Sequence, residues 1–167
     1  MIRRTRSIIF LAIIIGFSFI LSISVLYEGD TYRAFSFNMQ ITEIHVVKNE
    51  TSGRFHRVEV SVNIDNPSLN TRLRFIHADT RIWLNNTPLR YGWGVKGSSF
   101  YLQPGENRTF SFYYPTPEDD WELLQWAEDT NTWNWLLYQE PFVNAGFLGS
   151  IEVIRINTFE GVQIIPP

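Results

Sequence analysis

The 167-residue chain contains no cysteine, which excludes disulfides, thiolate metal sites, iron–sulfur clusters and cysteine nucleophiles. Histidine is scarce: His45, His56 and His77 fall on separate predicted strands or in a loop, without the i, i+4 spacing that places zinc ligands on one helix face. No glycine-rich phosphate loop and no serine nucleophile motif occurs. We therefore expect no catalytic residues, no metal site, no cofactor and no enzymatic activity.

Charge is absent from one long stretch, residues 7–27, with the sequence SIIFLAIIIGFSFILSISVLY. At a helical rise of about 1.5 Å per residue it spans roughly 30 Å, which matches the hydrocarbon core of a bilayer. Backbone polar groups inside lipid must be satisfied internally, so the stretch must be helical. We predict a transmembrane helix over residues 7–27.

Basic residues cluster on one side of this stretch: Arg3, Arg4 and Arg6 precede it, whereas Glu28 and Asp30 follow it. The positive-inside rule makes these three arginines the topology-determining residues. Residues 1–6 are then a cytoplasmic basic tail of a single-pass protein of the cell membrane. Everything from Glu28 onward lies outside the cytoplasm.

The apolar stretch has two other interpretations besides a signal-anchor. Ser22 and Ser24 have the spacing of a signal-peptidase site, but the stretch is longer than the usual 7–15-residue core of a cleaved signal peptide. A pilin-like helix would need a processing site before the stretch, and Arg6-Ser7 is a poor one. A retained anchor is favoured.

The remainder of the chain is long enough for one domain. Residues 28–34 are predicted to be a short polar spacer and residues 35–167 the domain. With the three leading arginines set aside, 11 basic residues face 17 acidic ones, a net charge of about −6. This acidity argues against nucleic acid and against anionic lipid headgroups as partners.

Apolar and polar residues alternate with a period of two, most clearly over residues 58–64, which is typical of a half-buried strand. The phase slips near Glu43, which indicates a bulge. Asn85-Asn86 predicts a hairpin turn, and Pro104-Gly105 predicts another turn. The pattern indicates an antiparallel β-sandwich of the fibronectin-III/Ig-like kind. Its predicted strands are residues 35–47, 58–64, 73–84, 89–95, 100–102, 108–114, 147–156 and 161–165.

A helical segment interrupts the strands. Thr116 is a predicted N-cap, Pro117 suits the first helical position, and four acidic residues follow within the next turn and a half. The helix is expected to cover residues 117–128, and residues 133–138 are expected to add a further helical turn or two.

Several short motifs resemble those of the LEA14-like family (late embryogenesis abundant group 2, with the related water-stress and hypersensitive-response domain). The run VEVSVNIDNP, ending at Asn66-Pro67, resembles the family's strand that ends in Asn-Pro, and IWLNN, ending at Asn86, resembles its next strand and turn. Asn86 stands where the family has a turn glycine. The resemblance covers residues 35–167. It implies a β-sandwich without known catalytic residues, sometimes carried behind one membrane helix and associated with stress protection.

The aromatic group over residues 121–138 has three interpretations. Its rings could be buried where a helix caps an open end of the sandwich. They could form a docking surface, because Trp and Tyr are favoured anchors at interfaces. They could also contact lipid headgroups, although six nearby acids oppose this. The candidate partner-docking residues are Trp121, Trp126, Trp133, Trp135 and Tyr138.

Three sequons, at Asn49, Asn85 and Asn107, fall in predicted loops or turns and predict an extracellular glycoprotein. For the whole chain we favour non-catalytic protein binding by the ectodomain, as an accessory subunit of a membrane or cell-surface complex. A second hypothesis is stress or desiccation protection at the membrane surface. A third is a filament or motility-stator component that binds a surface layer.

Overall fold

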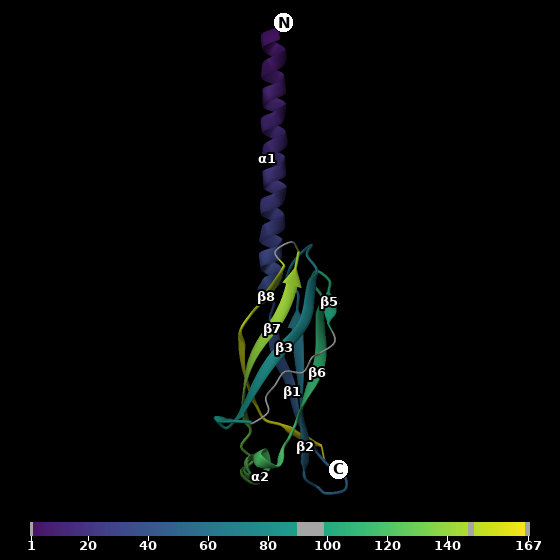
Figure 1. Cartoon of the computed structure of the whole chain (residues 1–167), viewed down its shortest axis with the longest axis vertical. Helices are drawn as coiled ribbons and strands as arrows, with labels where there is room; N and C mark the ends of the chain where they lie inside the picture. The colour runs from purple at the N-terminus through teal and green to yellow at the C-terminus, as the bar shows by residue number, and fades with distance from the viewer. Residues whose placement is uncertain (1, 90–98, 147–148, 166–167) are drawn as a thin grey trace.

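The structure is a computed structural model that describes residues 2–89, 99–146 and 149–165, with side chains from residue 10 onward. A long helix, α1 (Ile2–Phe35), leads into a domain of two packed β-sheets. A short helix, α2 (Trp121–Thr130), lies at the end of this domain opposite to α1 (Figure 1). The predicted class, a mainly-β sandwich with one inserted helical segment and one N-terminal helix, is confirmed.

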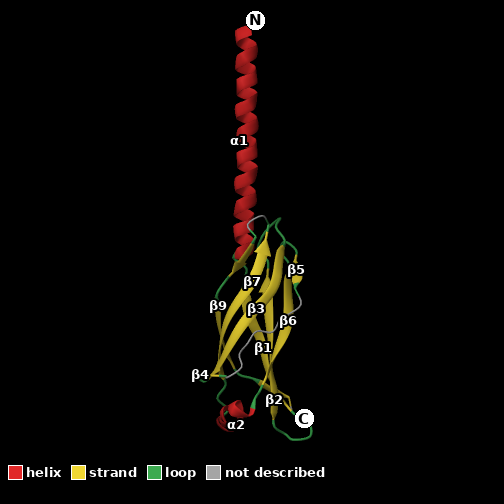
Figure 2. Ribbon diagram, in the orientation of Figure 1, coloured by secondary structure: helices red, strands yellow, loops and turns green. Residues whose placement is uncertain are grey.

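The two sheets lie face to face (Figure 2). One has the strand order β10-β1-β2-β6, and the other has the order β4-β3-β7-β8, with β5 also paired to β3 and β9 to β7. Among the described strands every pair is antiparallel except β1 with β10, which is parallel. The strands are β1 (Met39–Lys48), β2 (Phe55–Asp65), β3 (Leu73–Leu84), β4 (Thr87–Pro88), β5 (Phe100–Leu102), β6 (Asn107–Pro115), β7 (Asn134–Ala145), β8 (Ser150–Glu152), β9 (Arg155–Glu160) and β10 (Gln163–Ile165).

The core lies between the sheets and follows the predicted alternation. In β2, Val58, Val60, Val62 and Ile64 are fully buried, while the residues between them are partly exposed. The register of β1 against β2 shifts between Ile41 and Glu43, which confirms the predicted bulge. The β3–β4 turn is also confirmed: Asn85 and Asn86 have φ angles of 50° and 65°, the left-handed conformation that asparagine tolerates.

Three local predictions are wrong. Residues 28–34 are not a spacer, because α1 continues through them and buries Asp30, Thr31 and Ala34 against the domain. Thr116 does not cap a helix: a 3-10 turn, η1 (Glu118–Asp120), intervenes, and Asp120 directly precedes α2. Residues 133–138 are not helical, since all but the first belong to β7, which pairs with β3 on one side and β9 on the other.

Some predictions fall partly outside the described residues. The predicted strand 89–95 is described only at Leu89, which is buried beside β4. The predicted strand 147–156 is described from Gly149, where the chain forms β8 and then β9 with a break at residues 153 and 154. The side chains of Arg3, Arg4 and Arg6 also lie outside the described part of the chain.

Asn66, the asparagine of the Asn-Pro motif, is buried and fastens three segments together. Its Nδ2 group lies 2.9 Å from the carbonyl oxygen of Thr71 and 3.1 Å from those of Leu102 and Gln103. Its Oδ1 accepts a hydrogen bond of 3.2 Å from the backbone N–H of Ser68. One amide therefore joins the end of β2, the following loop and the β5–β6 turn.

We expect Asn66→Ala to lower the free energy of unfolding by about 2–3 kcal/mol, because it removes the buried amide that bonds the carbonyls of Leu102 and Gln103 and leaves the Thr71 carbonyl only the hydroxyl of Ser68. Asn63→Ala is the matched control: Asn63 makes a single, exposed hydrogen bond to Thr109, so its loss should cost about 1 kcal/mol or less. Equilibrium urea unfolding of the detergent-solubilised chain measures both. Equal effects of the two substitutions would contradict the fastening role of Asn66.

The last turns of α1 are seated on the loop that follows β2. The carboxylate of Asp30 accepts hydrogen bonds from the backbone N–H groups of Leu69 at 2.7 Å and Asn70 at 2.8 Å, and from the Thr71 hydroxyl at 2.8 Å. On the adjacent side Gly146, at a φ of 55°, lies against α1, and a Cβ there would be 2.8 Å from Oγ1 of Thr31. The last turns of α1 are thus part of the folded domain and not a flexible linker.

Burial alone would raise the pKa of Asp30, but the hydrogen bonds from Leu69, Thr71 and Asn70 outweigh burial and hold the pKa below its ordinary value of 3.8. The stabilisation from this carboxylate is therefore complete above its ordinary pKa and is lost as the pH falls through the lowered value.

We expect Asp30→Asn to weaken protection of the Leu69 and Asn70 amides in hydrogen–deuterium exchange at neutral pH, because an asparagine has one acceptor oxygen facing three donors. In the natural chain the same protection should fall only below pH 4, after correction for intrinsic exchange, while the variant should show no such step. If the protection of the Leu69 and Asn70 amides changed neither with the substitution nor with pH, this account of the junction would be contradicted.

Candidate partner-binding surface

The predicted aromatic group does not form one surface. Trp133 and Trp135 are buried, with exposed fractions of 5% and 2%, and their rings stack at 5.9 Å. Nε1 of Trp135 donates a hydrogen bond of 3.2 Å to the carbonyl of Gly161, which holds the segment before β10. Trp121 and Tyr138 are partly buried, whereas Trp126 is 50% exposed. Two of the five candidates are therefore core residues, and Trp126 is the most accessible.

Helix α2 divides into a buried and an exposed face. Leu124 and Ala127 are fully buried against the domain. The opposite side carries Trp126 with polar and acidic neighbours at the i, i+3, i+4 and i+7 spacing of one helix face. We call these exposed residues the α2 face: Glu122, Gln125, Trp126 and Asp129.

Polar contacts fix α2 to the sandwich. Nζ of Lys48, at the end of β1, lies 2.7 Å from both carboxylate oxygens of Glu128. The buried hydroxyl of Tyr114 donates a hydrogen bond of 2.7 Å to Asp120 directly before α2. Asn131, with a φ of 49°, ends the helix in the left-handed conformation. These ties make the α2 face a preformed surface.

A shallow hollow of about 250 Å³ adjoins the α2 face. The guanidinium of Arg54 lies 4.7 Å from the ring centre of Trp121 and 4.0 Å from a carboxylate oxygen of Glu118. The hollow therefore combines an aromatic wall with charges of both signs. It is lined by Gly53, Arg54, Phe55, Trp121, Glu122 and Gln125.

The position of α2 argues against lipid contact by this group. The 12-residue strands β3 and β7 run along the domain and span about 40 Å at 3.3 Å per residue. Figure 1 shows α2 beyond one end of them and α1 at the other. The α2 face is thus out of reach of a bilayer that α1 would span.

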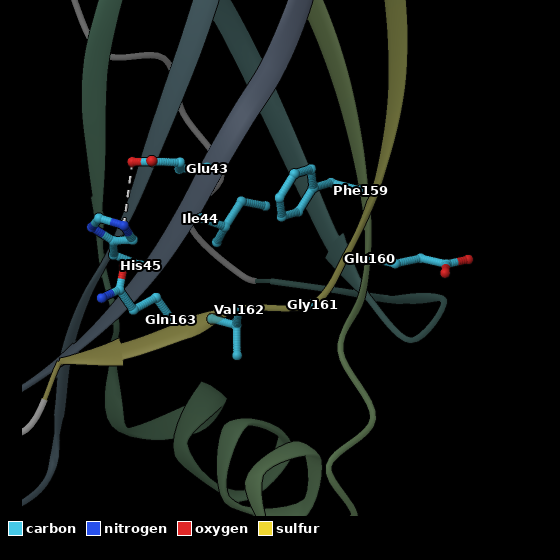
Figure 3. A pocket seen from close by; sticks show the side chains of 8 residues that line it. All are labelled: Glu43, Ile44, His45, Phe159, Glu160, Gly161, Val162 and Gln163. Carbon is cyan, nitrogen blue, oxygen red and sulfur yellow. Dashed lines mark ion pairs between the residues drawn. The ribbon is translucent and has the colours of Figure 1, made fainter.

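A second, smaller hollow of about 160 Å³ lies between β1 and the segment that joins β9 to β10 (Figure 3). Nε2 of His45 lies 3.4 Å from the Glu43 carboxylate, while Glu160 points away from both. His56 is exposed elsewhere, and His77 stacks on Phe142 at 5.3 Å. Within the described ranges, the structure does not bring the three histidines together.

The three sequon asparagines differ in accessibility. Asn49 and Asn107 are exposed. Asn85 is engaged on both sides of its amide: Nδ2 donates to the carbonyl of Thr132 at 2.8 Å, and Oδ1 accepts from the N–H of Asn134 at 3.1 Å. Glycosylation remains a prediction for Asn49 and Asn107, and at Asn85 it would require these bonds to break.

Searches by sequence found no matching protein-family model and no matching curated protein. Solved structures do match. An Arabidopsis thaliana protein solved in solution superposes with a TM-score of 0.51 at 12% identity, covering 76% of this chain and 82% of that protein. A candidate late embryogenesis abundant (LEA) protein, also solved in solution, has a TM-score of 0.46 at 12% identity, with 91% and 85% covered. An Archaeoglobus fulgidus protein has a TM-score of 0.46 at 10% identity, with 77% and 96% covered.

At such low identities the first of these similarities shows a shared fold and nothing about activity. The N-terminal helix is a separate finding: an 18-residue window within Phe10–Phe35 has a mean hydropathy of 2.5, so α1 is long and apolar enough to cross a membrane by length and composition. Every residue from Phe10 to Gly29 is exposed. The chain therefore combines this β-sandwich fold with one candidate membrane-spanning helix.

Core and surface tryptophans should differ sharply in their contribution to stability. We expect Trp135→Ala to lower the free energy of unfolding by about 3–5 kcal/mol, because it removes a buried indole and leaves a cavity. Trp126→Ala should change it by about 0.5 kcal/mol or less, because the ring is half-exposed on a helix surface. Urea unfolding followed by circular dichroism measures both. A large loss for Trp126→Ala would show that its ring is structural.

Proposed function

We propose that the chain is a non-catalytic, single-pass membrane protein of the LEA14-like type that binds a partner protein through the α2 face. Its N-terminus is cytoplasmic and its β-sandwich extracytoplasmic, as the arginines at positions 3, 4 and 6 predict. It acts as an accessory subunit of a membrane or cell-surface complex. The observation that carries this proposal is the exposed indole of Trp126 on a fixed helix at the end of the domain farthest from α1.

The chemistry of the α2 face indicates the kind of partner. Trp126 offers a large amphipathic ring, the side chain most often found at interface hot spots. Glu122 and Asp129 flank it with negative charge, and exposed Glu118 and Asp119 precede the helix. Opposite charges steer association and select partners. The partner therefore presents a basic surface with a pocket for an indole ring.

Purification of the full chain in mild detergent at native abundance tests this proposal. A stoichiometric partner should accompany the natural chain, and Trp126→Ala should weaken its binding by at least about 30-fold, the effect of a hot spot of 2 kcal/mol. Reversing the charge with Glu122→Lys and Asp129→Lys should have the same direction of effect and should reduce the salt dependence.

Tyr113→Ala is the matched control, because Tyr113 is a more exposed aromatic residue, at 61%, on strand β6 outside the α2 face. It should leave the partner bound. Recovery of the natural chain as a lone monomer would contradict the proposal and favour stress protection without a fixed partner. Full binding by Trp126→Ala would place the interface elsewhere.

A further inference from the structure

Two arginines near the α1 end of the domain enclose an exposed tyrosine. The guanidinium of Arg72 lies 4.7 Å and that of Arg74 5.6 Å from the ring centre of Tyr101, which pairs with Arg74 across β3 and β5. Both arginines are exposed, and Tyr101 is 48% exposed. In the described part of the chain neither arginine has a carboxylate partner within 4.0 Å. Stacking holds both cations in place, and among the described residues their N–H donors have no hydrogen-bond partner.

Acids in the adjoining segments are bound to other groups: the carboxylate of Asp30 accepts hydrogen bonds from Leu69, Asn70 and Thr71, directly before Arg72. Oδ1 of Asp65 accepts a hydrogen bond from the N–H of Asn38, and Oε2 of Glu106 accepts one of 2.7 Å from the N–H of Gln103. The positive charge of the two arginines is therefore not cancelled by an ion pair in its surroundings. It remains available to an anion from outside the chain.

The junction with α1 fixes the depth of this region. Asp30 lies three residues beyond Tyr27, the end of the uncharged stretch, which is about 4.5 Å along the helix axis. The headgroup layer on each side of a bilayer is roughly 5–7 Å deep. The loop whose N–H groups bind Asp30 therefore lies at headgroup depth. It presents Leu69, an apolar residue that is 68% exposed, and it leads directly into Arg72.

We propose that Leu69, Arg72, Arg74 and Tyr101 form a juxtamembrane patch that binds the lipid headgroups of the bilayer crossed by α1. Leu69 enters the boundary with the acyl chains, Tyr101 lies among the headgroups, and the guanidinium groups donate hydrogen bonds to lipid phosphates. This inference rests on the membrane insertion of α1 in the proposed function. It identifies a lipid-binding surface at the end of the domain opposite to the α2 face.

The negative net charge of the domain does not oppose such contact. Four exposed acids, Glu118, Asp119, Glu122 and Asp129, lie on or beside α2, about 40 Å from the patch by the length of the strands. At physiological ionic strength charges are screened beyond about 8 Å. The phosphates therefore sense the arginines together with the nearby Asp30, Asp65 and Glu106, each of which already accepts a hydrogen bond from a backbone N–H, and not the distant acids.

Site-directed spin labelling tests the patch, because a chain without cysteine accepts one unique label. The full chain carrying Leu69→Cys is labelled with a nitroxide and reconstituted into vesicles of phosphatidylcholine and phosphatidylglycerol. Collision rates with oxygen and with a water-soluble nickel chelate report the depth. We expect the nickel collision rate at position 69 to be several-fold lower than in Thr51→Cys, in the loop between β1 and β2 near α2. Phe17→Cys, in the middle of the apolar stretch, reports insertion of α1.

The arginines are tested in the Leu69→Cys background. Arg72→Gln with Arg74→Gln should raise the nickel collision rate at position 69 several-fold. Arg81→Gln is the matched control. Arg81 lies on β3, as Arg74 does, but farther from α1; its guanidinium is 5.7 Å from the ring centre of Tyr138 on β7, and its substitution should have no effect.

The outcomes separate the two proposals. If the Phe17 label is accessible to nickel, the membrane anchor itself fails. If the Phe17 label is protected but position 69 is as accessible as position 51, the patch is refuted and the anchor stands. If position 69 is protected regardless of the arginine substitutions, or if Arg81→Gln acts equally, binding of phosphate by Arg72 and Arg74 is refuted.

Discussion

The contact between the Asp30 carboxylate and the loop after β2 determines how the whole molecule is arranged. Three donors converge on this one side chain, and the buried amide of Asn66 anchors the same loop to the β5–β6 turn. A carboxylate that accepts several hydrogen bonds holds its partners more strongly than neutral groups do. The helix therefore enters the domain as a structural element, and the direction of α1 sets the direction of the sandwich.

This arrangement separates the two ends of the domain chemically. The end beside α1 carries arginines stacked on aromatic rings, including Arg108, 4.6 Å from the ring centre of Phe100, and its acids Asp30 and Glu106 are bound to backbone N–H groups. The far end carries the acids of η1 and α2, together with Trp126. A net charge of about −6 describes neither end, since the strands between them are several screening lengths long. Total charge is thus a poor guide to what each end can bind.

The strands could be predicted because their information is local. Alternation over residues 58–64 and the asparagines at positions 85 and 86 act through neighbouring residues, and both predictions are confirmed. The contacts of Asp30 could not be predicted, because its partners lie 39 to 41 residues away and an acid after an apolar stretch resembles any polar spacer. The sheet register could not be read from the sequence either.

The candidate site was predicted only in part, for a similar reason. The helix and its tryptophans were located, but composition does not say which indoles are buried. The sequence holds only a weak strand signal: Trp133 and Trp135 flank the polar Asn134 with a period of two, but the apolar Leu136 interrupts the alternation. Because a helix precedes residues 133–138, the sequence favours further helical turns there. Asn131 argues against this, since asparagine is suited to the left-handed conformation that ends α2.

The continuity of α1 has a consequence for assembly within the bilayer. Successive residues of an α-helix are turned by about 100° about its axis, and no break separates the apolar stretch from the turns that seat on the domain. If α1 crosses a membrane, the rotation of the sandwich about the helix axis is therefore fixed relative to each side of α1. A partner that binds one side of α1 within the lipid would then also determine the orientation of α2 about the membrane normal, some 40 Å beyond the membrane.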